Sequence, residues 1–309
     1  MSLTNLQRSL LVSLLALPLT GCLFRSHKVE RQVSPQPLKS ATQQDLLAYI
    51  DAQAAKIRSM QATVDIDTTV GGSKKGVVTD YQSIRGYILA RKPAMLRMIG
   101  LLPVVRTQAF DMVSDGTQFK LWIPPKNRFV IGPEDVPVPN PQQPLENLRP
   151  KIIYDALLIP AIDPQNEIAV MENGYETVID SRRHRVEVPD YEILIIGKNA
   201  LGWILERKIV FSRTDLLPHR QMVYDYAGNM VTDAHYEGYK DYDGINFASQ
   251  VEISRPQEEY DITLTMVKLQ FNQPLPDDKF LLQQPPGAQV VRLNQPSTSQ
   301  VSGVQGDPK

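Results

Sequence analysis

The chain has very little cysteine and no excess of charge of either sign. One cysteine, Cys22, stands among 309 residues, so no disulfide can form within the chain. Lysine and arginine together number 33, against 34 aspartates and glutamates, and the formal net charge is −1. This balance provides neither the electrostatic footprint of a nucleic-acid-binding protein nor a polybasic patch for a membrane surface. Nucleic acid is therefore not an expected partner.

Catalytic signatures are missing as well. The sequence has no His-Glu-x-x-His motif, no paired cysteines, no Gly-x-Ser-x-Gly elbow and no Gly-rich phosphate loop. The aspartates and tyrosines between Tyr224 and Tyr242 allow a carboxylate site, but an exposed strand face with aromatic cross-strand pairs is the simpler explanation. The basic run at 182–185 fits a solvated turn or a contact to anionic lipid heads. We expect no enzyme, no metal site and no cofactor.

The N-terminus has the pattern of a secretory signal. Arg8 precedes an apolar stretch, Leu10–Leu19, which is shorter than the roughly 20 residues that span a bilayer. The quartet that ends at Cys22, Leu-Thr-Gly-Cys, resembles the bacterial lipoprotein lipobox. That resemblance implies a diacylglyceryl group on the Cys22 thiol, acyl chains such as palmitate, and cleavage after residue 21. The alternative is an ordinary signal peptide followed by a buried cysteine.

The remaining chain divides by composition. Residues 1–21 form the predicted lipoprotein signal peptide, and the polar residues 22–41 form a flexible linker behind the lipid anchor. Residues 42–282 are long enough for one large domain, and 283–309, rich in Pro, Ser, Thr and Gln, form a predicted disordered tail. No later stretch is apolar enough to span a membrane. The expected arrangement is a soluble body on a lipid anchor.

Two segments have helical periodicity. In the first, Ser40 or Thr42 can cap a helix whose apolar stripe contains Leu46, Ile50 and Ile57. This stripe fits core packing, or a helix that lies across the mouth of a cavity as a lid. In the second segment, apolar residues between Leu148 and Leu157 form an amphipathic helix that Pro160 ends.

Elsewhere the apolar residues alternate with polar ones, as in half-buried strands. Roughly a dozen strands are expected, with turns at Asp115-Gly116, Gly228-Asn229 and Asp243-Gly244. One strand is interpreted as having a single apolar face, formed by the alternating residues Trp203, Leu205, Ile209 and Phe211. In the last strand the apolar phase switches near Met266, because of a bulge or because both faces are buried.

The predicted fold is mainly β with two or three helices. A sheet of this length curls, so we expect a large curled antiparallel sheet, a half-open β-barrel with helices over the cavity mouth. Such an interior encloses either a ligand or the protein's own side chains.

Three local features resemble the LolA/LolB superfamily, over about residues 42–290. They are the apolar loop Ile99-Gly100-Leu101-Leu102-Pro103, the turn and strand at 115–124, and Asp278-Lys279-Phe280 followed by Pro285-Pro286-Gly287. The resemblance implies an outer-membrane lipoprotein that faces the periplasm and handles acylated lipoproteins or lipids, with a periplasmic carrier protein as a possible partner. It also implies that the loop formed by Gly100, Leu101, Leu102 and Pro103 touches the membrane. A buried turn is the alternative for this loop.

The expected mechanism is binding of acyl chains in an apolar cavity. The residues expected to line it are Val64, Ile66, Trp122, Trp203 and Leu205, and the expected lid consists of Leu46, Ile50 and Ile57. The alternative function is that of a non-catalytic structural or sensing lipoprotein of the same fold, which binds a protein partner.

Overall fold

The computed structural model describes residues 37–74, 76–134, 149–179, 183–199 and 202–293. Cys22, the signal peptide, most of the linker and the end of the tail lie outside this part of the chain. The segment Thr177–Glu187 belongs to a second, small compact unit, and the architecture below is that of the larger unit. No helix among the described residues is long and apolar enough to cross a membrane.

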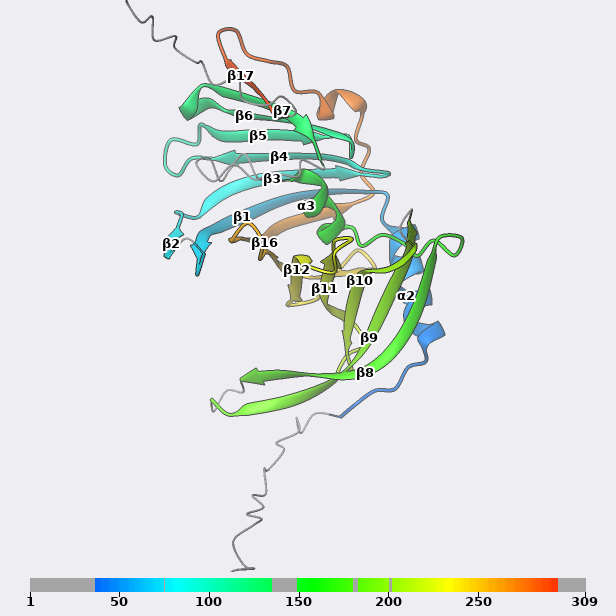
Figure 1. The fold of residues 1–309 in the computed structure, drawn as a ribbon. Coiled ribbons are helices and arrows are strands. Elements are labelled where there is room, and N and C mark those ends of the chain that lie inside the picture. The colour runs from blue at the N-terminus through cyan, green and yellow to red at the C-terminus, as the bar shows by residue number, and fades with distance from the viewer. Residues whose placement is uncertain (1–36, 75, 135–148, 180–182, 200–201, 294–309) are drawn as a thin grey trace, which may run out of the picture. The chain divides into compact units, whose positions relative to one another are not determined.

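The larger unit is mainly β, as predicted (Figure 1). The described helices are α2 (Gln43–Lys56) and α3 (Pro150–Leu157), with short 3₁₀ turns η2 (Pro124–Lys126) and η4 (Asp277–Phe280). The first strands are β1 (Ser59–Gly72), β2 (Val77–Asp80), β3 (Ile84–Arg91), β4 (Met95–Leu101), β5 (Gln108–Ser114), β6 (Gln118–Ile123) and β7 (Arg128–Pro133). After α3 come β8 (Glu167–Ile179), β9 (Arg185–Asn199), β10 (Gly202–Ser212), β11 (Pro218–Tyr224), β12 (Met230–Glu237), β13 (Lys240–Tyr242), β14 (Ile245–Phe247), β15 (Gln250–Arg255), β16 (Tyr260–Phe271) and β17 (Gln289–Arg292).

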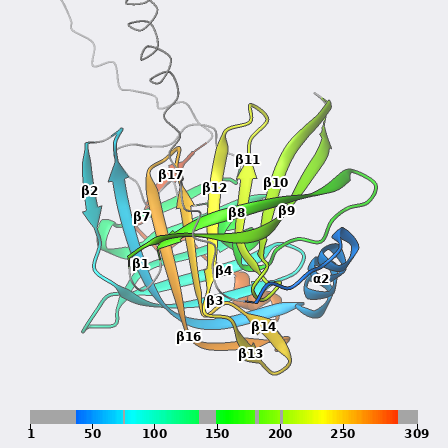
Figure 2. The same ribbon diagram turned by 90° about the horizontal axis from the view of Figure 1, so that it is seen from below.

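One sheet contains almost all of the described strands. Its order is β17-β7-β6-β5-β4-β3-β1-β16-β15-β12-β11-β10-β9-β8, with β2 also paired to β1. It is an open sheet and not a closed barrel, because β8 and β17 are its outer strands. The pairing is antiparallel as expected, except that β17 runs parallel to β7. Two meanders are joined where β16 returns to pair with β1, and β13 and β14 form a separate hairpin (Figure 2).

The sheet bends around α3. This helix contacts β4 and β5 on one side and β15 on the other. Five strand spacings separate β5 from β15 in the sheet, which is about 24 Å at ~4.8 Å each. A helix is only about 10 Å across, so both strands reach α3 only if the sheet curves. Pro150 begins the helix, and its buried residues Ile153, Ala156 and Leu157 fill the inside of the curve.

Two bulges decide which side chains face inward. In the β1–β16 pair, Thr63 lies opposite Lys268 and Val64 opposite Met266, which leaves Val267 as an extra residue that is 51% exposed. This confirms the bulge interpretation of the phase switch near Met266. In the β9–β10 pair, Leu205 lies opposite Ile196 and Arg207 opposite Ile195, which leaves Glu206 as the extra residue. The second bulge interrupts an alternation that looks regular in the sequence.

Local breaks in the chain set several strand boundaries. Two strands, β2 and β3, lie between Val77 and Arg91 and pair with successive parts of β1. In the described residues, β8 is one continuous strand from Glu167 to Ile179. The Asp115-Gly116 turn is present, because the Asp115 carboxylate accepts hydrogen bonds from the Thr117 and Gln118 amides. Gly116 has a φ of +89°, which a residue without a Cβ adopts without strain.

Candidate apolar cavity

Helix α2 begins at a complete capping box. The Thr42 hydroxyl accepts a hydrogen bond from the Asp45 amide at 3.2 Å, and the Asp45 carboxylate accepts one from the Thr42 amide at 2.8 Å. These two bonds satisfy amide groups that the first turn of a helix leaves without partners. Thr42, rather than Ser40, is therefore the residue that fixes where the helix starts.

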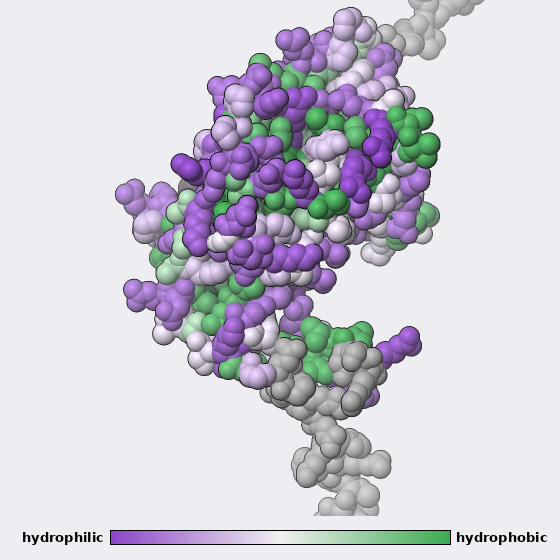
Figure 3. Space-filling model, turned by 180° about the vertical axis from the view of Figure 1, so that it is seen from behind, coloured by the Kyte–Doolittle hydropathy of each residue, from purple (hydrophilic) through white to green (hydrophobic). Residues whose placement is uncertain are grey.

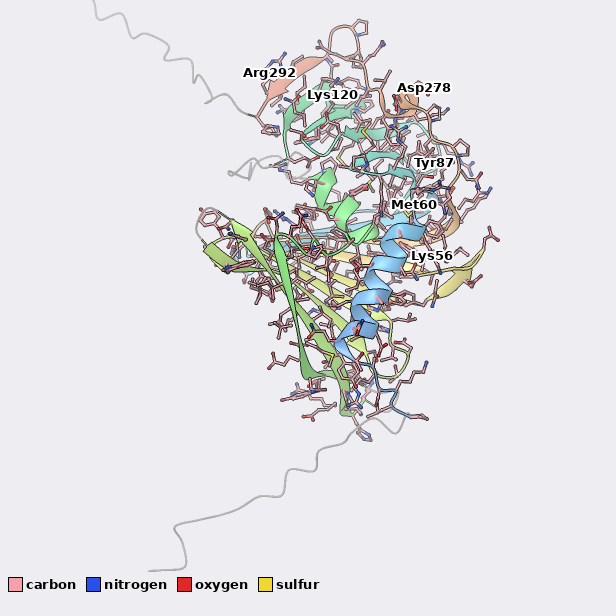
Figure 4. All side chains as sticks on the ribbon, turned by 90° about the vertical axis from the view of Figure 1, so that its right-hand side faces the viewer. Lys56, Met60, Tyr87, Lys120, Asp278 and Arg292 are labelled. Atoms are coloured by element: carbon pink, nitrogen blue, oxygen red, sulfur yellow. The ribbon has the colours of Figure 1, made fainter. Side chains whose placement is uncertain are left out.

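The two halves of α2 pack against different surroundings. Leu46 and Ile50 belong to a small apolar cluster with buried residues of β9 and β10, and the Tyr49 ring meets Phe211 edge-on at 5.9 Å. Ala54 and Ile57, at the C-terminal end, are also buried, and Ile57 belongs to the larger core. Figure 4 shows this end of the helix, where Lys56 is labelled, leading to Met60 in β1. The helix is thus held to β9 and β10 by its first half.

A cavity of about 60 Å³ lies beneath the second half of α2. Its walls come from α2, the end of α3 and the segments around β12 and β14. The wall residues are mostly apolar or aromatic: Tyr49, Ile50, Gln53, Ala54, Ile57, Lys92, Leu157, Leu158, Ile159, Pro218, Tyr236, Tyr239, Asn246, Phe247 and Ala248. A water molecule needs roughly 10–15 Å³ by such a measure, so the cavity has room for about four to six waters or a short hydrocarbon segment.

Two of the three tyrosine hydroxyls at the cavity wall have backbone carbonyl acceptors. Tyr236 donates to the carbonyl of Ala156 at 2.9 Å, and Tyr239 donates to the carbonyl of Pro218. Burial raises the pKa of both hydroxyls, so both remain protonated donors at neutral pH. The two side chains therefore offer mainly ring carbon to the cavity, and they tie β12 to α3 and β11.

One wall residue is a cation. The Lys92 ammonium donates a hydrogen bond to the carbonyl of Ala54 in the last turn of α2. Burial lowers the pKa of this half-buried lysine. Nearby, Oε1 of Gln53 is buried and accepts no hydrogen bond. The apolar cavity thus has a small polar end built from the end of α2 and the residue that follows β3.

Two of the three predicted lid residues lie on the cavity wall, whereas the residues predicted to line the cavity lie elsewhere. Of the lid, Ile50 and Ile57 line the cavity, and Leu46 packs on β9 and β10. None of the five residues expected to line a cavity lies on its wall. Val64 and Ile66 face inward but are packed into the core around α3, where they are 0% and 3% exposed.

The other three residues lie on the opposite face of the sheet. Trp122 alternates with the core residues Leu121 and Ile123, and its ring packs against Phe129 at 6.5 Å. The bulge at Glu206 turns Leu205 and Trp203 away from the face that Ile209 and Phe211 share with α2. Trp203 is 50% exposed, and the Lys198 ammonium lies 6.0 Å from its ring centre. These three residues do not line the cavity.

Sequence reasoning missed the wall formed by Tyr236, Tyr239 and Phe247. The stretch from Tyr224 to Tyr242 was expected to be an exposed face, yet Tyr236 is only 3% exposed. The alternation around Tyr236 and Ala234 in β12 was the available signal, since both point to the core. Nothing in the sequence around Lys92 indicated that it borders a cavity.

The predicted membrane-contact loop borders a second hollow. Leu101, Leu102 and Pro103 are half-buried and line a groove of about 380 Å³, together with Arg85, which pairs with Asp65 at 2.7 Å. The rest of the groove is lined by Thr63, Ser83, Ile84, Tyr87, Val104 and Arg106. The most exposed apolar residues of this loop are Val104, at 97%, and Val105, at 65%.

Exposed apolar residues also occur elsewhere. Figure 3 shows hydrophobic patches among the hydrophilic side chains on one face of the molecule. The segment Asp278-Lys279-Phe280 falls in η4, where Phe280 is buried and the Arg91 guanidinium lies 5.0 Å from the centre of its ring. Among the described residues, no group of three or more His, Cys, Asp or Glu side chains is arranged to hold a metal ion.

Comparison with known proteins gives structural neighbours only. No protein-family model and no curated protein matches the chain. A LolA superfamily protein from Nitrosomonas europaea has 13% identity over 79% of this chain and 99% of its own, with a TM-score of 0.48. A DUF1329 family protein from Desulfovibrio piger has 15% identity over 77% of this chain and 95% of its own, with a TM-score of 0.47.

The third neighbour is a protein domain from Vibrio parahaemolyticus named for outer membrane lipoprotein sorting. It has 11% identity over 76% of this chain and 94% of its own, with a TM-score of 0.47. The structural neighbours thus include LolA superfamily and lipoprotein-sorting proteins, as the sequence resemblance predicts. All three TM-scores lie below 0.5.

Proposed function

We propose that this chain binds an acyl chain of a lipid or of an acylated lipoprotein in the cavity beneath α2. The observation that supports this most directly is an unfilled apolar hollow between two amphipathic helices and a bent sheet. Burial of a methylene group is worth about 0.8 kcal/mol, so a segment of four to six carbons gains roughly 3–5 kcal/mol before the costs of association. Even without those costs, such a gain corresponds to a Kd of about 1 mM, so a segment of this length binds weakly at best.

A longer acyl chain needs more space than the cavity now has. The large core around α3 is filled by the protein's own side chains, so additional room has to come from movement of a wall. The second half of α2 covers the cavity and lies outside the apolar cluster with β9 and β10. It is held by the bond from Lys92 to the Ala54 carbonyl, by a bond from Asn272 to the Lys56 carbonyl and by the burial of Ile57. We place the opening at Ala54 and Ile57, where these contacts have to break.

We also propose that the chain is an envelope lipoprotein, anchored through Cys22 at the outer membrane and facing the periplasm. The lipobox supports this proposal. Exposed Val104 and Val105 are suited to contact the bilayer, while Leu101 and Leu102 support the loop from below. Mass spectrometry of the membrane-extracted protein tests the anchor: Cys22 should carry a diacylglyceryl group, and an unmodified Cys22 thiol would refute it.

The cavity itself is tested with a neutral ligand, 1-octanol, and the full chain. Calorimetric titration should detect binding, and Ala54→Leu should weaken it at least tenfold because the larger side chain fills the cavity. Ala55→Leu is the matched control, since Ala55 is the next residue of α2 and is exposed. Absence of octanol binding, or equal binding by Ala54→Leu and the native chain, would overturn the proposal.

A second candidate function is a non-catalytic lipoprotein that binds a protein partner. The filled core favours it, because most of the space inside the curve of the sheet is taken by α3 and the side chains around it. Under this alternative, neither octanol nor any other acyl ligand should bind to the full chain.

A further inference from the structure

The polar end of the cavity contains a lysine without an acidic partner. Lys92 follows the last residue of β3, and its backbone amide donates to the carbonyl of Arg58 at 3.0 Å. This bond holds the start of the lysine beside the end of α2, where its ammonium reaches the carbonyl of Ala54. An ammonium has three hydrogens to donate, and this contact uses one.

No carboxylate of the described residues forms an ion pair with Lys92. Burial alone shifts its pKa, and it shifts it downward, as expected for a cation that is partly removed from water without a counter-ion. Most other basic residues in partly buried positions are paired, such as Arg97 with Asp111 and Arg207 with Glu167. A half-buried cation that bonds a backbone carbonyl but has no counter-ion, at the wall of an apolar cavity, is suited to an anionic ligand group.

Gln53 provides a second, independent indication. Its side chain lines the same cavity, and its Oε1 atom is buried without any hydrogen-bond partner. Buried polar atoms in native proteins are nearly always hydrogen-bonded, so an unpaired one at a cavity wall marks a place for a ligand atom. As placed, this oxygen is an acceptor, and the other end of the amide bonds the Tyr49 hydroxyl. A half-turn of the amide puts an N–H donor at this position, where it is able to bind an anionic oxygen, and the Tyr49 hydroxyl then donates to Oε1.

We propose that the cavity takes a single-chain amphiphile with an anionic head, a carboxylate or a phosphate. The head binds the Lys92 ammonium and the Gln53 amide, and the hydrocarbon chain lies against Ile50, Ile57 and Leu157. This inference deepens the proposed function and rests on it, because it assigns the head group of the acyl ligand. A neutral diacylglycerol, or an ester without a free anionic group, has no negative charge to pair with the Lys92 ammonium.

The test compares three ligands of equal chain length, octanoate, octyl phosphate and 1-octanol, by calorimetric titration of the full chain at pH 7.5. Octanoate or octyl phosphate should bind at least tenfold more tightly than 1-octanol, and the tighter of the two identifies the head group. Lys92→Gln should remove this preference, while Lys92→Arg should retain it because the positive charge remains. Lys56→Gln is the matched control, since Lys56 is exposed in the last turn of α2.

Binding of the neutral ligand, 1-octanol, distinguishes failure of the head-group assignment from failure of the proposed acyl-binding cavity. If octanol binds equally to the native chain and to Lys92→Gln, the variant is folded and its cavity is intact. Equal affinity of all three ligands for the native chain would then overturn the assignment of the head group and leave the apolar cavity standing. If none of the three ligands binds to the native chain, the proposed function fails together with this inference.

Discussion

Replacing Asp190 by asparagine should stabilise the protein at neutral pH and have little effect in mild acid. Asp190 lies on β9 opposite Ser212 of β10, is 4% exposed, and has a buried Oδ1 atom without a hydrogen-bond partner. Burial, together with the negative charges of Glu192 and Glu176, raises the pKa of its carboxyl group to about 6, from 3.8. Lys208 opposes this shift but does not cancel it.

The sign of the effect follows from linkage. A carboxyl group whose pKa is raised by folding favours the protonated folded state, so ionisation destabilises the fold. The cost is absent well below pH 3.8, grows as the pH rises toward 6, and is complete above 6. A difference of about two pKa units corresponds to about 3 kcal/mol, at ~1.36 kcal/mol per unit. Asparagine has nearly the same shape and no charge, so it removes this cost.

The assay is urea unfolding of the full chain at pH 4.0, 5.5 and 7.5. For Asp190→Asn the free energy of unfolding should exceed that of the native chain by up to about 3 kcal/mol at pH 7.5, and the difference should fall to about 0.6 kcal/mol at pH 4.0. Asp233→Asn is the control, because it should change the free energy of unfolding in the opposite direction. Despite burial, hydrogen bonds from His235 and Arg220 lower the pKa of Asp233 to about 2, so its removal should destabilise the fold at pH 7.5. A pH-independent effect of Asp190→Asn, or a loss of stability at pH 7.5, would refute the reasoning.

Three further predictions concern the cavity wall, the exposed loop and a strained turn. Tyr236→Phe removes the donor to the Ala156 carbonyl and should lower the free energy of unfolding in urea by about 1–3 kcal/mol. Tyr226→Phe is the control: this side chain is 74% exposed, so its free energy of unfolding should not change measurably. Exchanging both Val104 and Val105 for serine should leave the unfolding midpoint unchanged and weaken sedimentation with phospholipid vesicles, because both side chains are exposed. Leu102→Ser should lower the unfolding midpoint, because Leu102 is half-buried beside the groove. Equal unfolding midpoints for the two variants would contradict the division of this loop into exposed valines and a packed leucine. Gly71→Ala should destabilise the protein by about 2 kcal/mol or more. Gly71 has a φ of +113°, and an added Cβ would lie 1.9 Å from the Val77 carbonyl oxygen. An unchanged melting temperature of this variant would exclude the clash.

The sequence was sufficient to predict the mainly β fold, the capped first helix and several of the turns, because these depend on local patterns. The Thr42 capping box and the Asp115-Gly116 turn both use residues within four positions of each other. The inward-facing residues were harder to predict. One extra residue at Glu206 reverses the facing of Trp203 and Leu205, and the bulge is only visible once β9 is known to be the partner of β10.

Apart from the lid residues Ile50 and Ile57, the cavity wall could not be predicted, for a similar reason. This wall combines residues from near 50, 92, 157, 218 and 236–248, and no local pattern connects these five segments. Lys92 has no sequence neighbour that indicates its role. Its position follows from the bond of its amide to Arg58 and from the pairing of β3 with β1.

The pairing of β1 with β16 has a consequence for how the protein is made. Met60 lies beside Phe271, so one edge of β1 has no neighbour until more than 200 further residues have been synthesised. While the chain is incomplete, β1 and β3–β7 can assemble in order, yet β1 meanwhile exposes a row of unpaired amides and carbonyls. A chain that stops before Tyr260 retains this open edge and should aggregate, and the native sheet cannot be completed until Tyr260–Phe271 has been synthesised.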